Sequence, residues 1–141
     1  MNYLTICDGL GAVHLALQRR GWACVGASEI AAFPKAVVKH RWALRDLGDM
    51  TRFREWPEPL LADTDLVVAG TPCQAFSVAG KREGLADERG IVTLEFVALF
   101  HHINTIRKRN GRPPAIILWE NVDGALTMDD NAFGCFLGGL L

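Results

Sequence analysis

One cysteine in the chain stands where a nucleophile could be presented to a substrate. Residues 65–70 form an apolar run with two adjacent valines that ends in glycine, as expected for a buried strand. Active sites of open parallel sheets form at the carboxyl ends of such strands. Cys73 follows this run directly after Pro72 and leads into a polar segment. A thiolate there would be accessible, and a nearby helix N-terminus or cation would stabilise it.

A zinc deaminase is the first alternative for a proline–cysteine pair, and the sequence excludes it. Such enzymes need a second cysteine three residues later and an upstream His-x-Glu. Position 76 is Phe76, and no histidine in the chain is followed by Glu two residues on. The four cysteines form no Cys-x-x-Cys pair, so we predict no metal site. The other three fit the usual role of a buried structural thiol: Cys7, Cys24 and Cys135.

A carboxylate follows the last apolar run, at residues 115–119. Glu120 stands at the end of this run, where burial would raise the pKa of the carboxyl and suit it to proton donation. The next residue, Asn121, could hold a loop or the edge of a substrate. The simpler alternative is an acidic residue that leaves the sheet into water.

A glycine turn and an acidic residue near the N-terminus favour an adenosine-containing cofactor. Gly9 and Gly11 follow the first apolar run and would let the backbone approach a ligand at the start of a helix. Glu29 comes about 20 residues later, where an acid accepts hydrogen bonds from ribose hydroxyls. A tight turn and a helix-terminal charge are the simpler interpretations. His14 replaces the third glycine of the dinucleotide fingerprint, which disfavours a nicotinamide-dependent oxidoreductase.

The elements that would position these residues alternate along the chain. We predict strands at residues 3–7, 23–28, 46–50, 65–70 and 115–119, and helices at residues 13–20, 31–40 and 93–108. Such alternation predicts an α/β fold with a mostly parallel sheet covered on both faces. Residues 71–89 form a long polar loop of a kind that is often functional. The strand at residues 115–119 would form an apolar sheet edge that needs cover.

Composition narrows the class of protein without identifying it. The chain has 141 residues, of which half are hydrophobic, and a formal net charge of −1. This is typical of one globular domain and excludes a surface that is basic all round, although a single basic face remains compatible with DNA binding. The sequence shows neither a secretory signal nor an apolar run long enough to span a bilayer. We therefore expect a cytoplasmic protein with free thiols and no membrane partner.

Several segments resemble, in order, the first six motifs of the DNA cytosine-5 methyltransferases. The most specific is GTPCQAFS at residues 70–77, which continues through residues 79–90 as in that family. The other matching segments are CDGLG at 7–11, ASEI at 27–30, GDM at 48–50 and WENV at 119–122. The chain departs from the family's pattern at Cys7, Ala12 and Asp123, where an aromatic residue, a glycine and a proline are common. The family's later motifs and its target-recognition region have no counterpart.

The resemblance implies a Rossmann-like fold of the S-adenosylmethionine-dependent methyltransferases, truncated at its C-terminus. Residues 1–141 would be a partial catalytic domain that transfers a methyl group to carbon 5 of a cytosine flipped out of DNA. By resemblance, Cys73 is the nucleophile and Glu120 stabilises the reacting base. The residues expected at the cofactor are Cys7, Asp8, Gly9, Leu10, Gly11, Glu29, Ile30, Asp49, Met50 and Pro72. Those expected at DNA or in the nucleophile loop are Gln74, Ser77 and Asn121.

The missing motifs leave two further interpretations open. The chain could be an inactive remnant of a methyltransferase. It could also be one subunit of a split enzyme, whose complementary C-terminal chain would restore restriction-modification-type DNA methylation.

Overall fold

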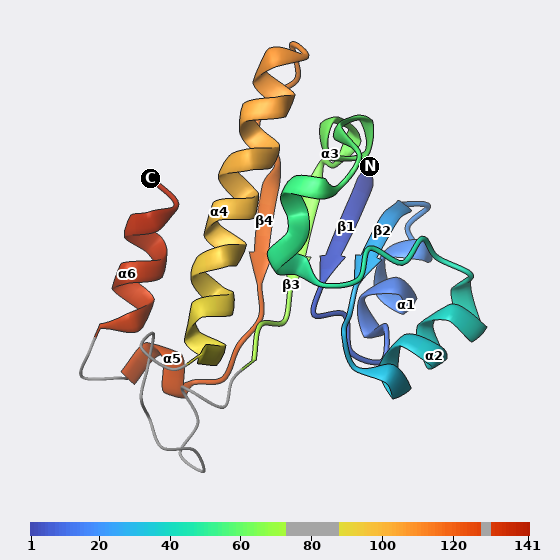
Figure 1. Ribbon diagram of the computed structural model, residues 1–141, viewed down its shortest axis with the longest axis horizontal. Helices are drawn as coiled ribbons and strands as arrows, with labels where there is room; N and C mark the ends of the chain where they lie inside the picture. Colours follow the sequence, from blue (N-terminus) through green and yellow to red (C-terminus); the bar gives the residue numbers. More distant parts are fainter. Residues whose placement is uncertain (73–87, 128–130) are drawn as a thin grey trace.

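The computed structural model describes residues 1–72, 88–127 and 131–141. Within them, four parallel strands form one sheet in the order β2-β1-β3-β4 (Figure 1). The strands are β1 (Asn2–Ile6), β2 (Ala23–Ser28), β3 (Leu66–Ala69) and β4 (Ile116–Trp119). The helices are α1 (Ala12–Gln18), α2 (Ala32–Trp42), the 3-10 helix η1 (Met50–Glu55), α3 (Glu58–Asp63), α4 (Glu88–Arg109), α5 (Gly124–Thr127) and α6 (Ala132–Gly139). The predicted α/β class and parallel sheet are confirmed.

The register of the sheet brings the carboxyl ends of its strands to one edge. In the centre, Ile6 of β1 lies between Ser28 of β2 and Ala69 of β3. Ala69 in turn pairs with Trp119 of β4. All four residues of β3 are buried, as its apolar sequence predicts. The loops that follow the strands therefore start next to one another.

Helices cover the two faces of the sheet unequally. Leu4 and Val67 face the larger core, against η1, α3, α4 and α6. Tyr3 and Val68 face the opposite way, into a smaller cluster with α1. Helix α2 lies beside α1 on this second face, to the right of the sheet in Figure 1, and α4 and α6 lie to the left. The sheet is thus sandwiched as predicted, except at β4.

The outer strand β4 exposes apolar side chains on the face that α1 covers further along the sheet. Ile116 is 56% exposed and Leu118 is 53% exposed, whereas Ile117 and Trp119 turn toward the larger core. The prediction that residues 115–119 form an apolar edge strand is therefore confirmed. Within the described ranges, this face of β4 is left open to solvent.

A buried arginine ties the end of α4 to two other segments. Arg107 is 2% exposed and donates to the carbonyl oxygens of Ala62 at 3.0 Å, Thr64 at 2.6 Å and Pro113 at 2.7 Å. Its remaining terminal nitrogen lies 3.2 Å from Asp65 Oδ1. The planar guanidinium can satisfy these acceptors together because its donors form a fixed fork. The basic end of α4 thus has a structural role.

The prediction of a strand at residues 46–50 is wrong. Asp46 makes only an isolated bridge to Ala27, and the chain then turns at Gly48, whose φ is +67°. Asp49 Oδ1 accepts hydrogen bonds from the backbone amide and the hydroxyl of Thr51, both at 2.9 Å. This aspartate cap starts the helix η1 at the end of the segment where a strand was expected.

Two helices near the C-terminal end of the described chain also differ from expectation. Helix α4 begins at Glu88 rather than residue 93, because apolar spacing marks the buried stripe of a helix and not its ends. Helix α6 was not predicted, because its sequence is rich in glycine. Its Phe136 packs on Phe96 and Trp119, with ring centroids 6.4 and 4.2 Å away. Cys135 is exposed, which corrects the prediction that it is buried.

Two further expectations concern thiols and membranes. Cys7 and Cys24 are half-buried, and both are free thiols, like Cys135. Among the described helices, none combines the length and the apolar character needed to cross a bilayer.

Candidate functional site

A cavity of about 420 Å³ opens at the carboxyl ends of the strands. Segments from all four strand ends contribute to its wall, as the register of the sheet requires. Eight of the residues expected at the site line it: Cys7, Glu29, Ile30, Asp49, Met50, Pro72, Glu120 and Asn121. These expected residues therefore lie around one cavity.

Glu29 organises one side of this cavity. Its Oε2 accepts a hydrogen bond from the backbone amide of Gly9, and its Oε1 accepts from the amides of Ile30 and Ala31, each at 2.8 Å. Each carboxylate oxygen has two lone pairs, so the acid retains capacity for further donors. Exposed Ile30 and buried Met50 add apolar surface beside it. A carboxylate next to apolar side chains fits the ribose and ring of an adenosine-containing group.

Cys7 lies in the same wall but is held as a neutral thiol. Burial raises its pKa to about 11, and the nearby carboxylates of Glu29 and Asp49 add to this effect. Its backbone adopts a φ of 52°, at the point where the chain leaves β1. Cys7 is therefore a wall residue and lacks the lowered pKa that a nucleophilic cysteine requires.

Four residues of the first predicted motif do not line this cavity: Asp8, Gly9, Leu10 and Gly11. Leu10 points outward and is 57% exposed. The side chain of Asp8 is buried, and its Oδ2 lies 2.8 Å from His14 Nε2. Gly11 has a φ of +79°, and a Cβ there would meet the ring of Trp42 at 2.5 Å. His14 of α1 and Trp42 of α2 thus pack against the glycine turn and fix its position.

No local sequence pattern indicates the buried network beneath this turn. Tyr3 Oη lies 2.9 Å from His14 Nδ1, and the opposite ring nitrogen of His14 contacts Asp8. A carboxylate only accepts hydrogen bonds, so His14 Nε2 donates to Asp8, while Nδ1 pairs with the tyrosine hydroxyl. These partners come from β1, the turn and α1, and only the fold brings them together.

Glu120 stands at the end of β4, facing the end of β3. Its backbone amide donates to Ala69 at 2.9 Å, and a Cβ built on Gly70 would lie 3.4 Å from Glu120 Oε2. The side chain is exposed, which corrects the expectation of a buried carboxyl. Glu120 directly follows Trp119, the last residue of β4, so the sheet does not enclose its side chain. Cys73, Gln74 and Ser77 lie outside the described residues.

A second polar network, also missed from the sequence, joins the ends of β3 and β4. Thr71 Oγ1 lies 2.8 Å from Trp119 Nε1, 3.0 Å from Thr93 Oγ1 and 3.2 Å from Asn121 Nδ2. Thr71 and Thr93 are both buried. Thr71 and Asn121 belong to segments that the sequence singled out, but their pairing depends on the alignment of β3 with β4.

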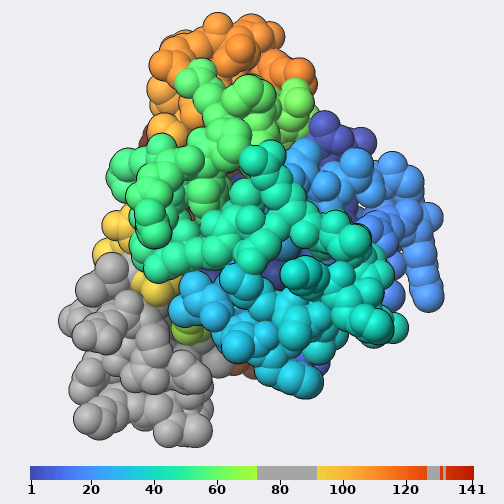
Figure 2. Space-filling view, turned by 45° about the vertical axis from the view of Figure 1, so that its right-hand side comes forward, coloured from blue at the N-terminus to red at the C-terminus, as the bar shows by residue number. Residues whose placement is uncertain are grey.

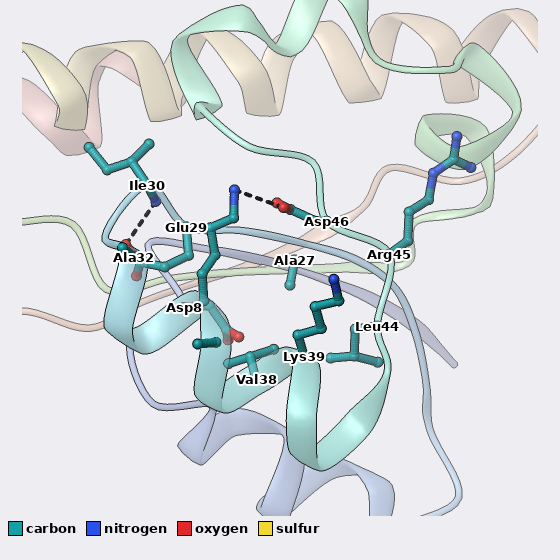
Figure 3. A pocket seen from close by; sticks show the side chains of 12 residues that line it. Asp8, Ala27, Glu29, Ile30, Ala32, Val38, Lys39, Leu44, Arg45 and Asp46 are labelled. Carbon is teal, nitrogen blue, oxygen red and sulfur yellow. Dashed lines mark hydrogen bonds and ion pairs between the residues drawn. The ribbon is translucent and has the colours of Figure 1, made fainter.

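A second cavity, of about 450 Å³, lies between α2 and the end of β2 (Figure 3). It meets the first one at Glu29 and Ile30, which line both. Lys35 Nζ binds Asp46 Oδ2 at 2.8 Å across it. In Figure 2, the teal chain before α3 lies against the cyan helix α2 on this face of the molecule. Within the described ranges, no group of three or more His, Cys, Asp and Glu side chains could hold a metal ion.

Comparison with known proteins gives a consistent family. The family model for C-5 cytosine-specific DNA methylase matches residues 1–137. Type II methyltransferase M.BsuFI of Bacillus subtilis is 31% identical over 141 residues, and M.HhaI of Haemophilus parahaemolyticus is 32% identical over 130 residues. These alignments cover 99% and 92% of this chain, but 32% and 36% of the relatives.

Two further similarities extend the comparison. A protein of Escherichia phage P1 named DNA N-6-adenine-methyltransferase is 45% identical over 140 residues, which are 98% of this chain and 19% of that protein. The crystal structure of the S. pombe Dnmt2 methyltransferase shares the fold, with a TM-score of 0.68 and 21% identity over 98% of this chain and 41% of that one. The chain thus spans between a fifth and two fifths of these proteins. By its family match, it belongs to the C-5 cytosine-specific DNA methylases.

Proposed function

We propose that this chain supplies the cofactor-binding and nucleophile-bearing part of a DNA cytosine-5 methyltransferase. The observation that carries the proposal is the single cavity lined by Glu29, Glu120 and the Thr71–Pro72 segment that leads to Cys73. A cofactor carboxylate, a second acid and the stem of a nucleophile loop therefore share one reaction space. Family membership supports the assignment of the chemistry.

Carbon 5 of cytosine is a poor nucleophile, so the reaction needs covalent activation. The Cys73 thiolate would add to carbon 6 of a flipped cytosine, which makes carbon 5 electron-rich. Glu120 would hydrogen-bond or protonate ring N3, so that negative charge does not accumulate on the base. Methyl transfer to carbon 5 would leave S-adenosylhomocysteine, and loss of the carbon-5 proton would then expel the Cys73 thiolate from carbon 6. The exposure of Glu120 leaves it accessible to a base entering from solvent.

S-adenosylmethionine would supply the methyl group that carbon 5 receives. Glu29 is placed to accept from the ribose hydroxyls, and Ile30 and Met50 to contact the adenine. Asp49 can also serve the adenine, because its cap on η1 uses only Oδ1. Gln74 and Ser77 are assigned to DNA contact or to the nucleophile loop.

The chain covers only part of the length of its relatives, so the complete activity could require a second polypeptide. M.BsuFI and M.HhaI extend well beyond the part that aligns with this chain. A complete enzyme would therefore need further residues that supply target recognition. A complementary chain could provide them, as in a split methyltransferase. An inactive remnant is the alternative.

Methylation of adenine at N6 is a second candidate, because the 45% identical phage P1 protein is named for it. That name describes a protein of which this chain covers 19%, so the adenine chemistry can reside in the remainder. Transfer to an exocyclic amine does not require covalent attack on the ring. It would leave Cys73 and Glu120 without a role.

Nucleoside analysis separates these alternatives. The chain is incubated with DNA and radiolabelled S-adenosylmethionine, alone and with candidate complementary chains, and the DNA is digested and analysed by mass spectrometry. We expect 5-methylcytosine, which Cys73→Ser abolishes while cofactor binding, measured by calorimetry, persists. Formation of N6-methyladenine would overturn the proposal, as would turnover in Cys73→Ser. Cofactor binding without methylation in any combination would indicate the remnant.

A further inference from the structure

We infer that the Thr71 hydroxyl is a positioning residue for the reaction proposed above. It fixes the strand-end segment before Cys73 against the segment that carries Glu120. Its buried oxygen has three side-chain neighbours, from β4, from the segment after β4 and from α4. The inference rests on the proposed function for its catalytic meaning, but the network itself can be tested separately.

The donors and acceptors of this network can be assigned from chemistry alone. Trp119 Nε1 and Asn121 Nδ2 are donors only, so the Thr71 oxygen accepts from both. Its own hydrogen is left for Thr93 Oγ1 at 3.0 Å. The orientation of the Asn121 amide is set independently, because its Oδ1 accepts from the backbone amide of Val122 at 2.9 Å. The Thr71 hydroxyl therefore uses both lone pairs and its hydrogen.

The backbone of Thr71 is held by the same partner. Asn121 Nδ2 also lies 3.3 Å from the Thr71 carbonyl oxygen. That carbonyl belongs to the peptide bond with Pro72, whose ring restricts the chain further. Cys73 follows two residues after Thr71, and Glu120 lies between two partners of the hydroxyl, Trp119 and Asn121. One side chain thus holds the residues on either side of Glu120 to Thr71, two positions before Cys73.

Two substitutions of Thr71 distinguish a positioning role of its hydroxyl from general packing of its side chain. Replacing threonine by the similarly shaped valine keeps the volume but leaves the part-buried Trp119 indole N–H without its acceptor, and leaves Asn121 Nδ2 with the Thr71 carbonyl oxygen alone. It also removes the donor to Thr93. Unpaired polar groups of this kind are costly when buried, so the two segments should shift until water reaches them. Serine keeps the hydroxyl and loses only a methyl group, and it should preserve the network.

The test compares Thr71→Val and Thr71→Ser with a matched threonine. Thr105→Val is the control, because Thr105 is on the exposed part of α4 and its hydroxyl binds only the His101 carbonyl among the contacts described. Two readouts do not depend on methylation. One is the indole N–H resonances of the four tryptophans in a nitrogen-15 correlation spectrum. The other is the rate at which iodoacetamide alkylates Cys73, with exposed Cys135 as the internal reference.

In Thr71→Val, we expect the Trp119 indole resonance to move while the other three stay in place. The ratio of the Cys73 to the Cys135 alkylation rate should change by several-fold. Where methylation is measurable, kcat should fall about tenfold or more, since small displacements of reacting groups cost that much, with KM for DNA little changed. Thr71→Ser should restore all three values, and Thr105→Val should alter none.

Unchanged Cys73 reactivity in folded Thr71→Val would overturn the positioning role. If that variant does not fold, Thr93→Val removes the acceptor of the Thr71 hydrogen and leaves Thr71 itself in place, and an unaltered Cys73 rate there would have the same meaning. Methylation in the wild type without any response to Thr71→Val would reject this inference and leave the proposed function intact. If Thr71→Val changes the Cys73 alkylation rate but the protein methylates no cytosine, the positioning role stands and the proposed function is rejected.

Discussion

The backbone amide of Gly9 donates to Glu29 Oε2 over 2.8 Å and thereby joins the turn after β1 to the end of β2. The same carboxylate caps the segment before α2 through Ile30 and Ala31. Glu29 therefore shapes the wall of the cavity before any ligand is bound. A change at this acid should affect both the turn and the ligand.

We expect Glu29→Gln to weaken the binding of S-adenosylmethionine by about tenfold or more. Hydrogen bonds to a charged group contribute about 1.5–3 kcal/mol, and the amide of glutamine accepts through one oxygen only. Calorimetric titration of the variant measures the change. Glu55→Gln is the matched control, since Glu55 is exposed and pairs with Arg52 on η1. Equal affinity in the wild type and Glu29→Gln would remove Glu29 from the binding site.

Gly11→Ala should destabilise the fold more than Gly21→Ala does. Both glycines have positive φ, +79° and +74°, so alanine is strained at either position by roughly 1–2 kcal/mol. Only at Gly11 would the new Cβ also meet a ring, that of Trp42 at 2.5 Å. Overpacking of this kind adds about 1–3 kcal/mol. Urea unfolding followed by circular dichroism gives the two values, and equal losses would show that Trp42 moves aside freely.

Replacing the buried Arg107 by lysine should lower the free energy of unfolding by at least about 2 kcal/mol. Lysine cannot bond Ala62, Thr64 and Pro113 together, and each buried acceptor left unpaired costs about 1–3 kcal/mol. Thermal and urea unfolding provide the measurement. In Arg109→Lys, which changes an exposed pair with Glu58, we expect almost no loss. A similar effect in both variants would refute the structural role of Arg107.

Acid should weaken the fold partly through Asp65. The backbone amide of Asn2, followed by the Arg107 guanidinium, holds the pKa of Asp65 below its ordinary value of 3.8. The folded state thus binds this proton less tightly than the unfolded chain. The stabilisation is complete above about pH 4 and is lost as the pH falls through the lower folded value.

Unfolding curves between pH 6 and about pH 2 test this dependence. The stability difference between the wild type and Asp65→Asn should be constant at higher pH and shrink in the acid range. Asp63→Asn removes an exposed carboxylate that pairs with Arg112, and it serves as the control. A difference for Asp65→Asn that does not change with pH would contradict the prediction.

Local sequence patterns predicted the strands of the sheet well, because a buried strand is a run of consecutive apolar residues. The prediction for β2 at residues 23–28 is confirmed at both ends, and β3 differs by one residue at each end. Parallel strands of this kind also predict that their carboxyl ends meet. The convergence of Glu29 and Glu120 on one cavity follows from that rule.

Features that depend on distant contacts were not predictable in the same way. The exposure of Glu120 depends on where the sheet ends, and the partners of Thr71 come from 22 to 50 positions away. At Asp49 the prediction failed for a local reason. Its side chain caps η1, so the chain forms a helix where a strand was expected. The roles of Cys73, Gln74 and Ser77 remain predictions.

The order of the strands has a consequence for how the protein reaches its fold. Strand β1 lies inside the sheet, yet its second neighbour, β3, follows it by more than sixty residues along the chain. During synthesis, β1 can pair early with β2, while its other edge waits for β3 to emerge from the ribosome. Until then, the backbone groups on that edge are open to any extended segment. Mispairing at β1 is therefore the folding error to which this topology is most exposed.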